Sequence, residues 1–320
     1  MDLGTWLDPE FTDLPELLTQ LRFSTESLPA IREEFASLPK TPLSDAVERI
    51  DHTVPGSRDR PRLTVRVRRP HGVAEPLPCL YGVHGLGYVV GGRELGDAPA
   101  DVWCPRLRCV AVSVEQRLAP ECPYPGPLED CYAGLKWTYE HATELGIDPA
   151  RIGVNGGGAG GGLAAGLCLV ARDRGEVPVR FQLLFYPMLD DRQVTASSQR
   201  MVPIWNPDAN AFAWKSYLGR LYGTDRIPAY AAASRAANLI GLPPTYMMVG
   251  ALDGLCDEAI DYAQRLNQSG VPTELHVYPG APHAFLGLKP TAWISKHAHR
   301  HLLGWLQRQL WPGADGPSSD

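Results

Sequence analysis

The sequence predicts an α/β fold in which a mostly parallel sheet is flanked by helices. Short apolar runs bounded by turn residues recur between about residue 60 and residue 280. Runs that are apolar at successive positions suit strands covered on both faces, which is typical of parallel sheets. Longer segments with apolar residues at helical spacing lie between them. This alternation of strand and helix along 320 residues indicates a doubly wound sheet.

The individual elements follow from these patterns. Residues 63–68 alternate between apolar and polar side chains, which predicts an edge strand. The other expected strands are the short runs 79–83, 109–114, 152–154, 181–185, 245–249 and 274–278. The expected helices are 127–145, 159–172, 258–267 and 293–310.

Two segments depart from this alternation and predict a helical cap. Residues 1–50 are leucine-rich, with helical pieces at 15–18 and 31–35, and show no strand signal before residue 63. A second segment, at about 190–230, is rich in aromatic residues. We expect both to cover the carboxyl edge of the sheet, where such folds bind ligands. The alternative is an insertion that only packs. The main domain is then 51–312, and 313–320 form a flexible polar tail.

Composition excludes several classes of function. The net charge of −6 and the lack of a basic stripe argue against nucleic acid as a partner. No apolar run approaches the roughly 20 residues that span a bilayer, and the first residues do not resemble a secretory signal. The seven cysteines are odd in number and form no C-x-x-C pair, which predicts neither disulfides nor a zinc site. A reducing cytoplasm fits best.

Four groups of polar and glycine residues each follow a predicted strand. The first is 84–88, His-Gly-Leu-Gly-Tyr, and the second is 115–121, Glu-Gln-Arg-Leu-Ala-Pro-Glu. The third is the glycine run 156–160, between a strand and a helix, which has the frame of a nucleophile elbow, G-x-S-x-G, with glycine at its centre. Asp253 and His283 each follow a late strand. Because parallel strands end at the same edge, we expect all four groups to meet there.

Together these motifs resemble the hormone-sensitive-lipase family of α/β-hydrolases, the bacterial carboxylesterases with HGGG, Y-R-L-A-P-E and G-x-S-A-G-G motifs. The resemblance covers about residues 60–310 and implies the α/β-hydrolase fold. It implies that Asp253 and His283 are the acid and base of a catalytic triad, and that Gly158 occupies the nucleophile position. It also implies an oxyanion hole, whose backbone donors stabilise charge on a carbonyl oxygen, formed by Gly85, Leu86, Gly87 and Ala159.

We assign eight more residues to the substrate pocket. They are His84, Tyr88, Gln116, Asn155, Gly157, Trp205, Gly254 and Leu255. No cofactor and no metal are predicted, because the His297, His299 and His301 side chains suit a solvated helix face. The glycine run also lacks the lysine of a phosphate-binding loop. The expected ligand is a small apolar carbonyl or ester-like molecule, and a homodimer is possible.

Several positions depart from the family pattern. Gly158 replaces serine, Leu86 replaces the middle glycine of HGGG, and Gln116 replaces the tyrosine of Y-R-L-A-P-E. Gly254 and Cys256 also differ from the residues usual in the acid loop. Several changes around one pocket indicate a site adapted away from ordinary esterase chemistry.

Glycine at the centre of an elbow has a simple structural explanation. The bend forces a positive φ, which strains other residues by about 1–3 kcal/mol and suits glycine. Loss of the serine removes roughly 10⁶-fold of turnover in proteases with the same triad logic. No replacement nucleophile is evident, because Ser197, Ser198 and Ser234 lie in cap or loop segments and Cys256 follows the acid loop.

The sequence leaves three functions open. The first is a repurposed enzyme that uses His283 and Asp253 for proton transfer next to a carbonyl, or for activating water against a reactive ester. The second is a carboxylesterase whose nucleophile has been removed by substitution at 158. The third is a protein that binds a small molecule without converting it.

Overall fold

The computed structural model describes residues 6–13, 22–38, 42–56, 62–202 and 204–313. The helical piece predicted at 15–18 and residues 314–320 of the predicted tail lie outside these ranges.

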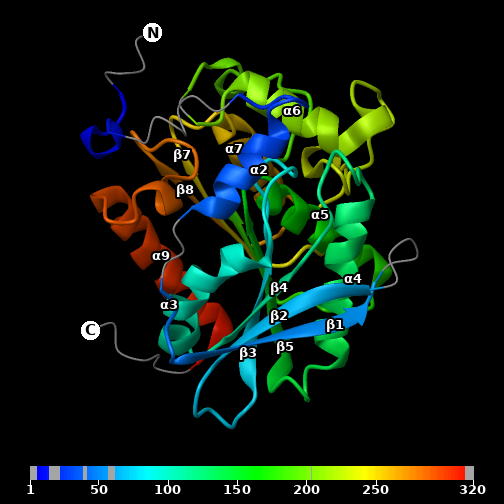
Figure 1. Cartoon of the computed structure of the whole chain (residues 1–320), viewed down its shortest axis with the longest axis vertical. Coiled ribbons are helices and arrows are strands. Elements are labelled where there is room, and N and C mark those ends of the chain that lie inside the picture. Colours follow the sequence, from blue (N-terminus) through cyan, green and yellow to red (C-terminus); the bar gives the residue numbers. More distant parts are fainter. Residues whose placement is uncertain (1–5, 14–21, 39–41, 57–61, 203, 314–320) are drawn as a thin grey trace.

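One sheet of eight strands forms the centre of the molecule (Figure 1). Its order is β1-β2-β4-β3-β5-β6-β7-β8, with β2 antiparallel to β1 and β4 and all other neighbours parallel. The strands are β1 Val47–Pro55, β2 Arg62–Pro70, β3 Leu77–Val83, β4 Val110–Val114, β5 Ile147–Gly157, β6 Phe181–Phe185, β7 Thr245–Gly250 and β8 Thr273–Tyr278. This is the mostly parallel α/β sheet that the apolar runs predicted.

Two sequence predictions for the start of the sheet were wrong. Strand β1 was not foreseen, and β2 is an inner strand because it pairs with β1 and β4. Strand β1 was missed because it buries only Val47 and Val54, which gives it a weak apolar pattern. The polar positions of β2 are not all solvated either, since Arg68 is buried and donates to Asp97 at 2.5 Å.

Helices cover both faces of the sheet. Apolar side chains of α4 (Gly126–Glu140), α5 (Ala159–Arg174) and α7 (Cys256–Gln268) form a core on one face. Those of α3 (Asp97–Leu107) and α9 (Trp293–Leu310) form a second core on the other, and Figure 1 shows these two groups on opposite sides. The other α-helices of the described ranges are α2 Leu28–Ser37, α6 Pro207–Leu218 and the short α8 Phe285–Leu288. Helix α3 was not predicted, because its two prolines obscure the helical pattern.

The N-terminal segment and the aromatic segment at 190–230 meet over the sheet. Figure 1 shows α2 beside α6 at the top of the molecule. Phe23, just before α2, lies edge-on to Trp205 with 5.9 Å between ring centroids, and its ring stacks on Phe212 of α6 at 6.2 Å. The two segments predicted to form a cap therefore contact each other.

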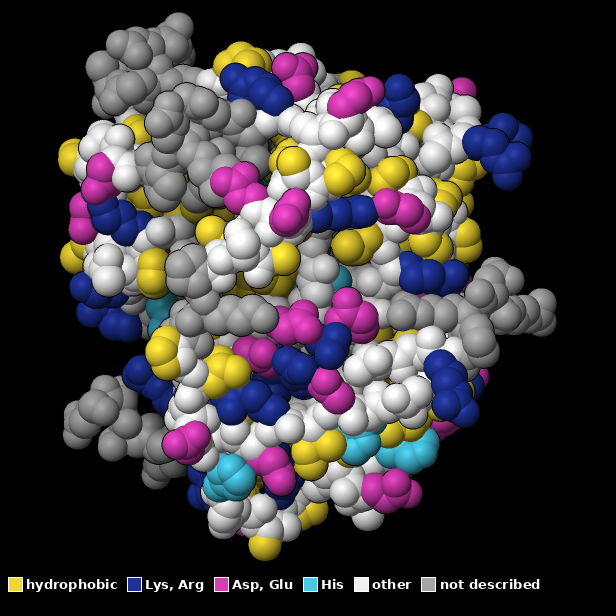
Figure 2. All heavy atoms as spheres, in the orientation of Figure 1, with side chains coloured by type: hydrophobic (Ala, Val, Ile, Leu, Met, Phe, Trp, Pro, Cys, Tyr) yellow, Lys and Arg dark blue, Asp and Glu magenta, His cyan; other side chains and the backbone are white. Residues whose placement is uncertain are grey.

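The surface carries both signs of charge. Over β1 and β2, Figure 2 shows basic side chains mixed with acidic ones, and the ion pairs there join arginines to aspartates and a glutamate. None of the helices in the described ranges combines the length and the apolar character that crossing a bilayer requires. None of the seven cysteines, all within those ranges, is joined to another by a disulfide.

Candidate active site

Gly158 sits on a sharp bend between β5 and α5. Its φ of 55° and ψ of −124° lie in a region that favours glycine. The bend is fixed by its backbone, since Gly158 N donates to Phe185 O at 3.0 Å and Gly158 O accepts from Met188 N at 2.9 Å. Gly156 and Gly160 allow the tight crossing, because a Cβ on either would overlap backbone atoms of the neighbouring segment. The glycine run thus builds the strand–turn–helix geometry of a nucleophile elbow.

Asp253 and His283 are buried in loops that follow β7 and β8 and are joined by a hydrogen bond. His283 Nδ1 lies 2.8 Å from Asp253 Oδ2. The other carboxylate oxygen accepts the backbone N–H of Leu255 at 2.9 Å, which fixes the carboxylate plane. This leaves His283 Nε2 directed at the bend, where a Cβ on Gly158 would lie 3.6 Å from it. The structure therefore brings Gly158, Asp253 and His283 together.

The loop at 84–90 lies against the start of α5 and under Trp205. A Cβ on Gly85 would lie 2.8 Å from Gly160 N, and one on Gly87 would lie 2.6 Å from Trp205 Cη2. Within the described residues, no hydrogen-bond acceptor takes the backbone N–H of Gly85, Gly87 or Ala159. Unpaired amides of this kind, among them that of Ala159 at the start of α5, are suited to hold negative charge.

Leu86 does not fit the expected set of donors. Its N–H donates to Val90 O at 3.0 Å, and Val90 N returns a bond to Leu86 O at 3.1 Å. This pair closes the loop as a small antiparallel bridge. The Leu86 amide is therefore already engaged in this geometry, unlike the amides of Gly85, Gly87 and Ala159.

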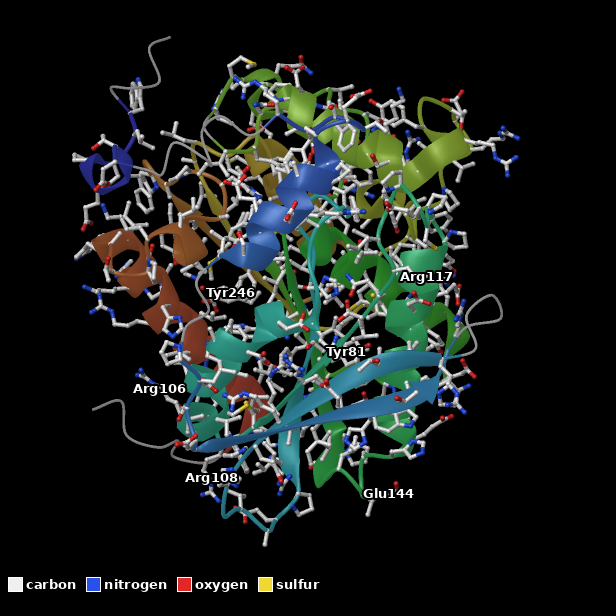
Figure 3. The ribbon with its side chains drawn as sticks, viewed as in Figure 1. Tyr81, Arg106, Arg108, Arg117, Glu144 and Tyr246 are labelled. Atoms are coloured by element: carbon white, nitrogen blue, oxygen red, sulfur yellow. The ribbon has the colours of Figure 1, made fainter. Side chains whose placement is uncertain are left out.

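His84 and Gln116 form a buried pair behind the loop. Gln116 Nε2 donates to the backbone carbonyl of His84 at 2.5 Å and lies 3.3 Å from its Nδ1. Burial lowers the pKa of His84 to about 4. The His84 imidazole is therefore neutral at physiological pH and is not a second acid. Next along the chain, Arg117 (labelled in Figure 3) bonds Asp130 of α4 at 2.8 Å, which anchors the segment 115–121.

Aromatic rings enclose the imidazole of His283. The Trp205 ring centroid lies 5.7 Å away, and its indole N–H donates to Asn210 at 3.0 Å. Gly254 gives room for this segment, since a Cβ there would lie 3.2 Å from Trp205 O.

Tyr186 also faces His283, edge-on at 5.0 Å, and was missed in the sequence. It has a positive φ of 37°, and a Cβ on Gly157 would lie 3.1 Å from its Cε2. Its position directly after β6, at the same sheet edge, is the signal that could have found it.

Two predicted pocket residues make their contacts elsewhere. The Tyr88 ring stacks on Tyr217 with 4.0 Å between centroids, and its hydroxyl lies 2.6 Å from where a Cβ on Gly162 would stand. The Asn155 amide lies beside Gly82 of β3. Neither set of contacts includes His283 or Gly158.

Three of the alternative nucleophiles, Cys256, Ser197 and Ser198, are either protonated or hydrogen-bonded to backbone carbonyls. Burial, together with the nearby Asp253, raises the pKa of the Cys256 thiol to about 12, so it remains protonated. The Ser197 hydroxyl donates to Gly254 O at 3.1 Å and that of Ser198 to Thr195 O at 2.9 Å. Within the described ranges, no three His, Cys, Asp or Glu side chains are grouped closely enough to bind a metal ion.

Comparison with known proteins identifies the family. A family model described as the alpha/beta hydrolase fold matches residues 80–287, which include the loop at 84–90, the bend, Asp253 and His283. The chain belongs to the α/β-hydrolase family. It is 33% identical to esterase LipI of Mycobacterium tuberculosis, over 82% of each chain. It is 34% identical to carboxylesterase NlhH of the same species, over 92% of this chain and 88% of that one.

Solved structures give the same result. A bacterial heroin esterase is 40% identical and superposes with a TM-score of 0.87 over 96% of this chain and 98% of that one. An esterase from the archaeon Pyrobaculum calidifontis is 31% identical, with a TM-score of 0.84 over 94% and 98% of the two chains. The chain thus has an esterase-like α/β-hydrolase fold, as the motifs implied.

Proposed function

We propose that this α/β-hydrolase uses His283 and Asp253 as an acid–base pair on a small, fairly apolar carbonyl or ester-like molecule, without a covalent enzyme intermediate. The observation that carries the proposal is that His283 Nε2 is directed at the position where relatives with the G-x-S-A-G-G motif have serine, and meets glycine there. A substrate atom or an attacking water can occupy the space that a serine side chain would take.

The geometry supports proton transfer in a defined direction. With its Nδ1 proton donated to Asp253, His283 presents a lone pair on Nε2 toward the bend. The imidazole takes a proton from a carbon next to the carbonyl, or from water that attacks it, and Asp253 stabilises the imidazolium that forms. Negative charge that develops on the carbonyl oxygen is held by the amides of Gly85, Gly87 and Ala159. The proton on Nε2 then returns to the product.

A second candidate is a carboxylesterase scaffold that has lost only its nucleophile. Its support is the room at position 158: a Cβ there has no neighbour closer than 3.6 Å, so a serine side chain fits beside His283. The relatives LipI and NlhH are named esterase and carboxylesterase. A third candidate, a binding protein without turnover, rests on the missing hydroxyl alone.

The substitution Gly158→Ser separates the two enzymatic candidates. If the scaffold has lost only its nucleophile, Gly158→Ser restores hydrolysis of p-nitrophenyl butyrate by several orders of magnitude. Gly158→Ala is the matched control, since it adds the same Cβ and backbone strain without the hydroxyl.

If the protein is the acid–base enzyme proposed first, Gly158→Ser does not improve turnover of its own substrate, and His283→Ala abolishes that turnover. A screen of short esters, β-keto compounds and enolisable ketones with the wild-type chain tests this directly. Ligand binding without any product, in the wild type and in Gly158→Ser alike, would instead establish the binding protein.

A further inference from the structure

We propose that Arg32, on the N-terminal helix α2, is a positioning residue that couples this helix to the loop at 84–90. The inference rests on the proposed role of that loop in holding a carbonyl oxygen. It extends that role to a residue of the cap that contacts neither the imidazole nor the bend.

The Arg32 side chain joins three segments of the chain. Its Nε donates to the backbone carbonyl of Val89 at 2.8 Å, and its Nη2 donates to that of Ala119 at 2.9 Å. The same guanidinium forms a two-pronged ion pair with Glu121, at 2.6 and 2.8 Å. The planar, five-donor guanidinium suits such simultaneous contacts, and the single ammonium of lysine cannot reproduce them.

The two backbone acceptors belong to segments that are already tied to each other. Ala119 N donates to Tyr88 O at 3.0 Å, next to the carbonyl that Arg32 bonds. On the other side of Val89, Val90 exchanges hydrogen bonds with Leu86. Val89 and Ala119 are fully buried, so the two carbonyls that Arg32 bonds belong to the interior of the protein. The Arg32 side chain itself is 29% exposed, and that of Glu121 is 62% exposed.

The segment that carries α2 also contacts the aromatic residue that covers the site. Phe23, five residues before the helix, packs on Trp205, which in turn lies beside both Gly87 and His283. Movement of this segment away from the sheet therefore removes a ring contact at Trp205 and the Arg32 bonds to Val89 and Ala119 together. In this proposal, the same movement of α2 that covers the site also orders the backbone amides at 85–87.

Hydrogen exchange of the full-length chain, measured by mass spectrometry, tests the coupling without any assumption about turnover. In Arg32→Ala, exchange of the amides of Leu86 and Val90 should accelerate roughly tenfold, the effect of one lost hydrogen bond. Arg32→Lys should show a smaller acceleration, and Glu121→Gln, which removes the exposed ion pair only, should show little.

Arg69→Ala is the matched control. Arg69 likewise donates to several backbone carbonyls, including Gly146 O at 2.6 Å and Val73 O at 2.8 Å, but these are remote from the loop at 84–90. Unchanged exchange at Leu86 and Val90 in Arg32→Ala, or an equal acceleration in Arg69→Ala, would overturn the proposal.

A second experiment measures ester hydrolysis by the variant Gly158→Ser with and without Arg32→Ala. There, Arg32→Ala should lower kcat for p-nitrophenyl butyrate roughly tenfold with KM changed less than about twofold, because misplaced amides weaken the transition state most. A rise in KM at constant kcat would contradict a positioning role. If Gly158→Ser is itself inactive, the second candidate function fails, and the exchange measurement still decides the role of Arg32.

Discussion

The Arg68 network at the antiparallel end of the sheet and the His84–Gln116 pair at the carboxyl edge of the parallel strands differ in how their buried polar atoms are paired. At the antiparallel end, each guanidinium nitrogen of Arg68 donates a hydrogen bond, to Asp97 at 2.5 Å, to Ser113 at 2.8 Å and to the backbone carbonyl of Arg93 at 2.6 Å. At the carboxyl edge of the parallel strands, His84 Nε2 and Gln116 Oε1 are buried and have no hydrogen-bond partner among the described residues. An unpaired buried polar group costs about 1–3 kcal/mol. We infer that the Arg68 network contributes stability, while the unpaired atoms of His84 and Gln116 lower it.

The largest effect is expected at the carboxyl edge of the parallel strands, where one substitution can disable the imidazole of His283. Asp253→Asn leaves the shape of the site intact but offers an amide to His283 Nδ1, so the imidazole adopts the wrong tautomer. Any turnover, by the wild type or by Gly158→Ser, should fall about 10⁴-fold, as in other triads. Initial rates measure the loss, with thermal unfolding as the control for folding. A loss below tenfold would remove Asp253 from the mechanism.

At the paired end, the opposite result is expected. Arg68→Met removes a charge whose partner Asp97 stays buried, retaining only Arg66 at 2.9 Å. The free energy of unfolding should fall by about 3–5 kcal/mol. Urea denaturation measures this, and the activity of the remaining folded protein should be unchanged. An unaltered unfolding midpoint would show that the buried network contributes no stability.

The pH dependence of stability sharpens the contrast. The pKa of His84 is lowered from 6.5 to about 4 by burial, so between these values the unfolded chain binds the extra proton. The contribution of His84 to stability is therefore fully present above pH 6.5, and it should fall by about 3 kcal/mol as the pH drops toward 4. His299 and His301, whose pKa values burial also lowers, add in the same direction.

The variant His84→Asn isolates the contribution of this one imidazole. Its unfolding free energy, measured by urea titration from pH 4.5 to 7.5, should show a shallower slope than that of the wild type. Its absolute stability is not the readout, because the substitution also changes packing behind the loop. An identical slope in the two proteins would exclude His84 as the source.

The smallest effect is expected for an exposed ion pair. Lys136, on α4, pairs with Glu176 at the surface. Because solvent screens both groups, Lys136→Gln should change the free energy of unfolding by less than about 1 kcal/mol. Thermal or urea unfolding in low salt measures the difference. A loss as large as that in Arg68→Met would mean that burial does not distinguish the two networks.

The sequence predicted those parts of the structure in which local pattern and burial agree. The parallel strands were found because their side chains are apolar on both faces, and the meeting of Asp253, His283 and Gly158 followed from their places after strands. Strand β1 was missed because it buries only Val47 and Val54, so its apolar pattern is weak. The inner position of β2 was missed because Arg68, a polar residue expected to face solvent, is buried and paired with Asp97.

Details of the site depend on loop conformation, which no local pattern encodes. The engagement of the Leu86 amide follows from a backbone turn that brings Val90 back to it. The approach of Tyr186 to His283 depends on a positive φ, which is uncommon for an aromatic residue. The Arg32 contacts join segments 57 and 87 residues apart, beyond any periodicity.

Glycine at the bend also bears on how this chain tolerates further change. Glycine adopts a φ of 55° without the strain that another residue would have there. The free energy of unfolding is higher by that amount, which is similar to the effect of a typical single substitution. This additional stability can absorb destabilising replacements elsewhere, including those around Leu86 and Gln116. Since glycine and serine codons can differ by a single nucleotide, a change from glycine to serine at position 158 is also a single evolutionary step.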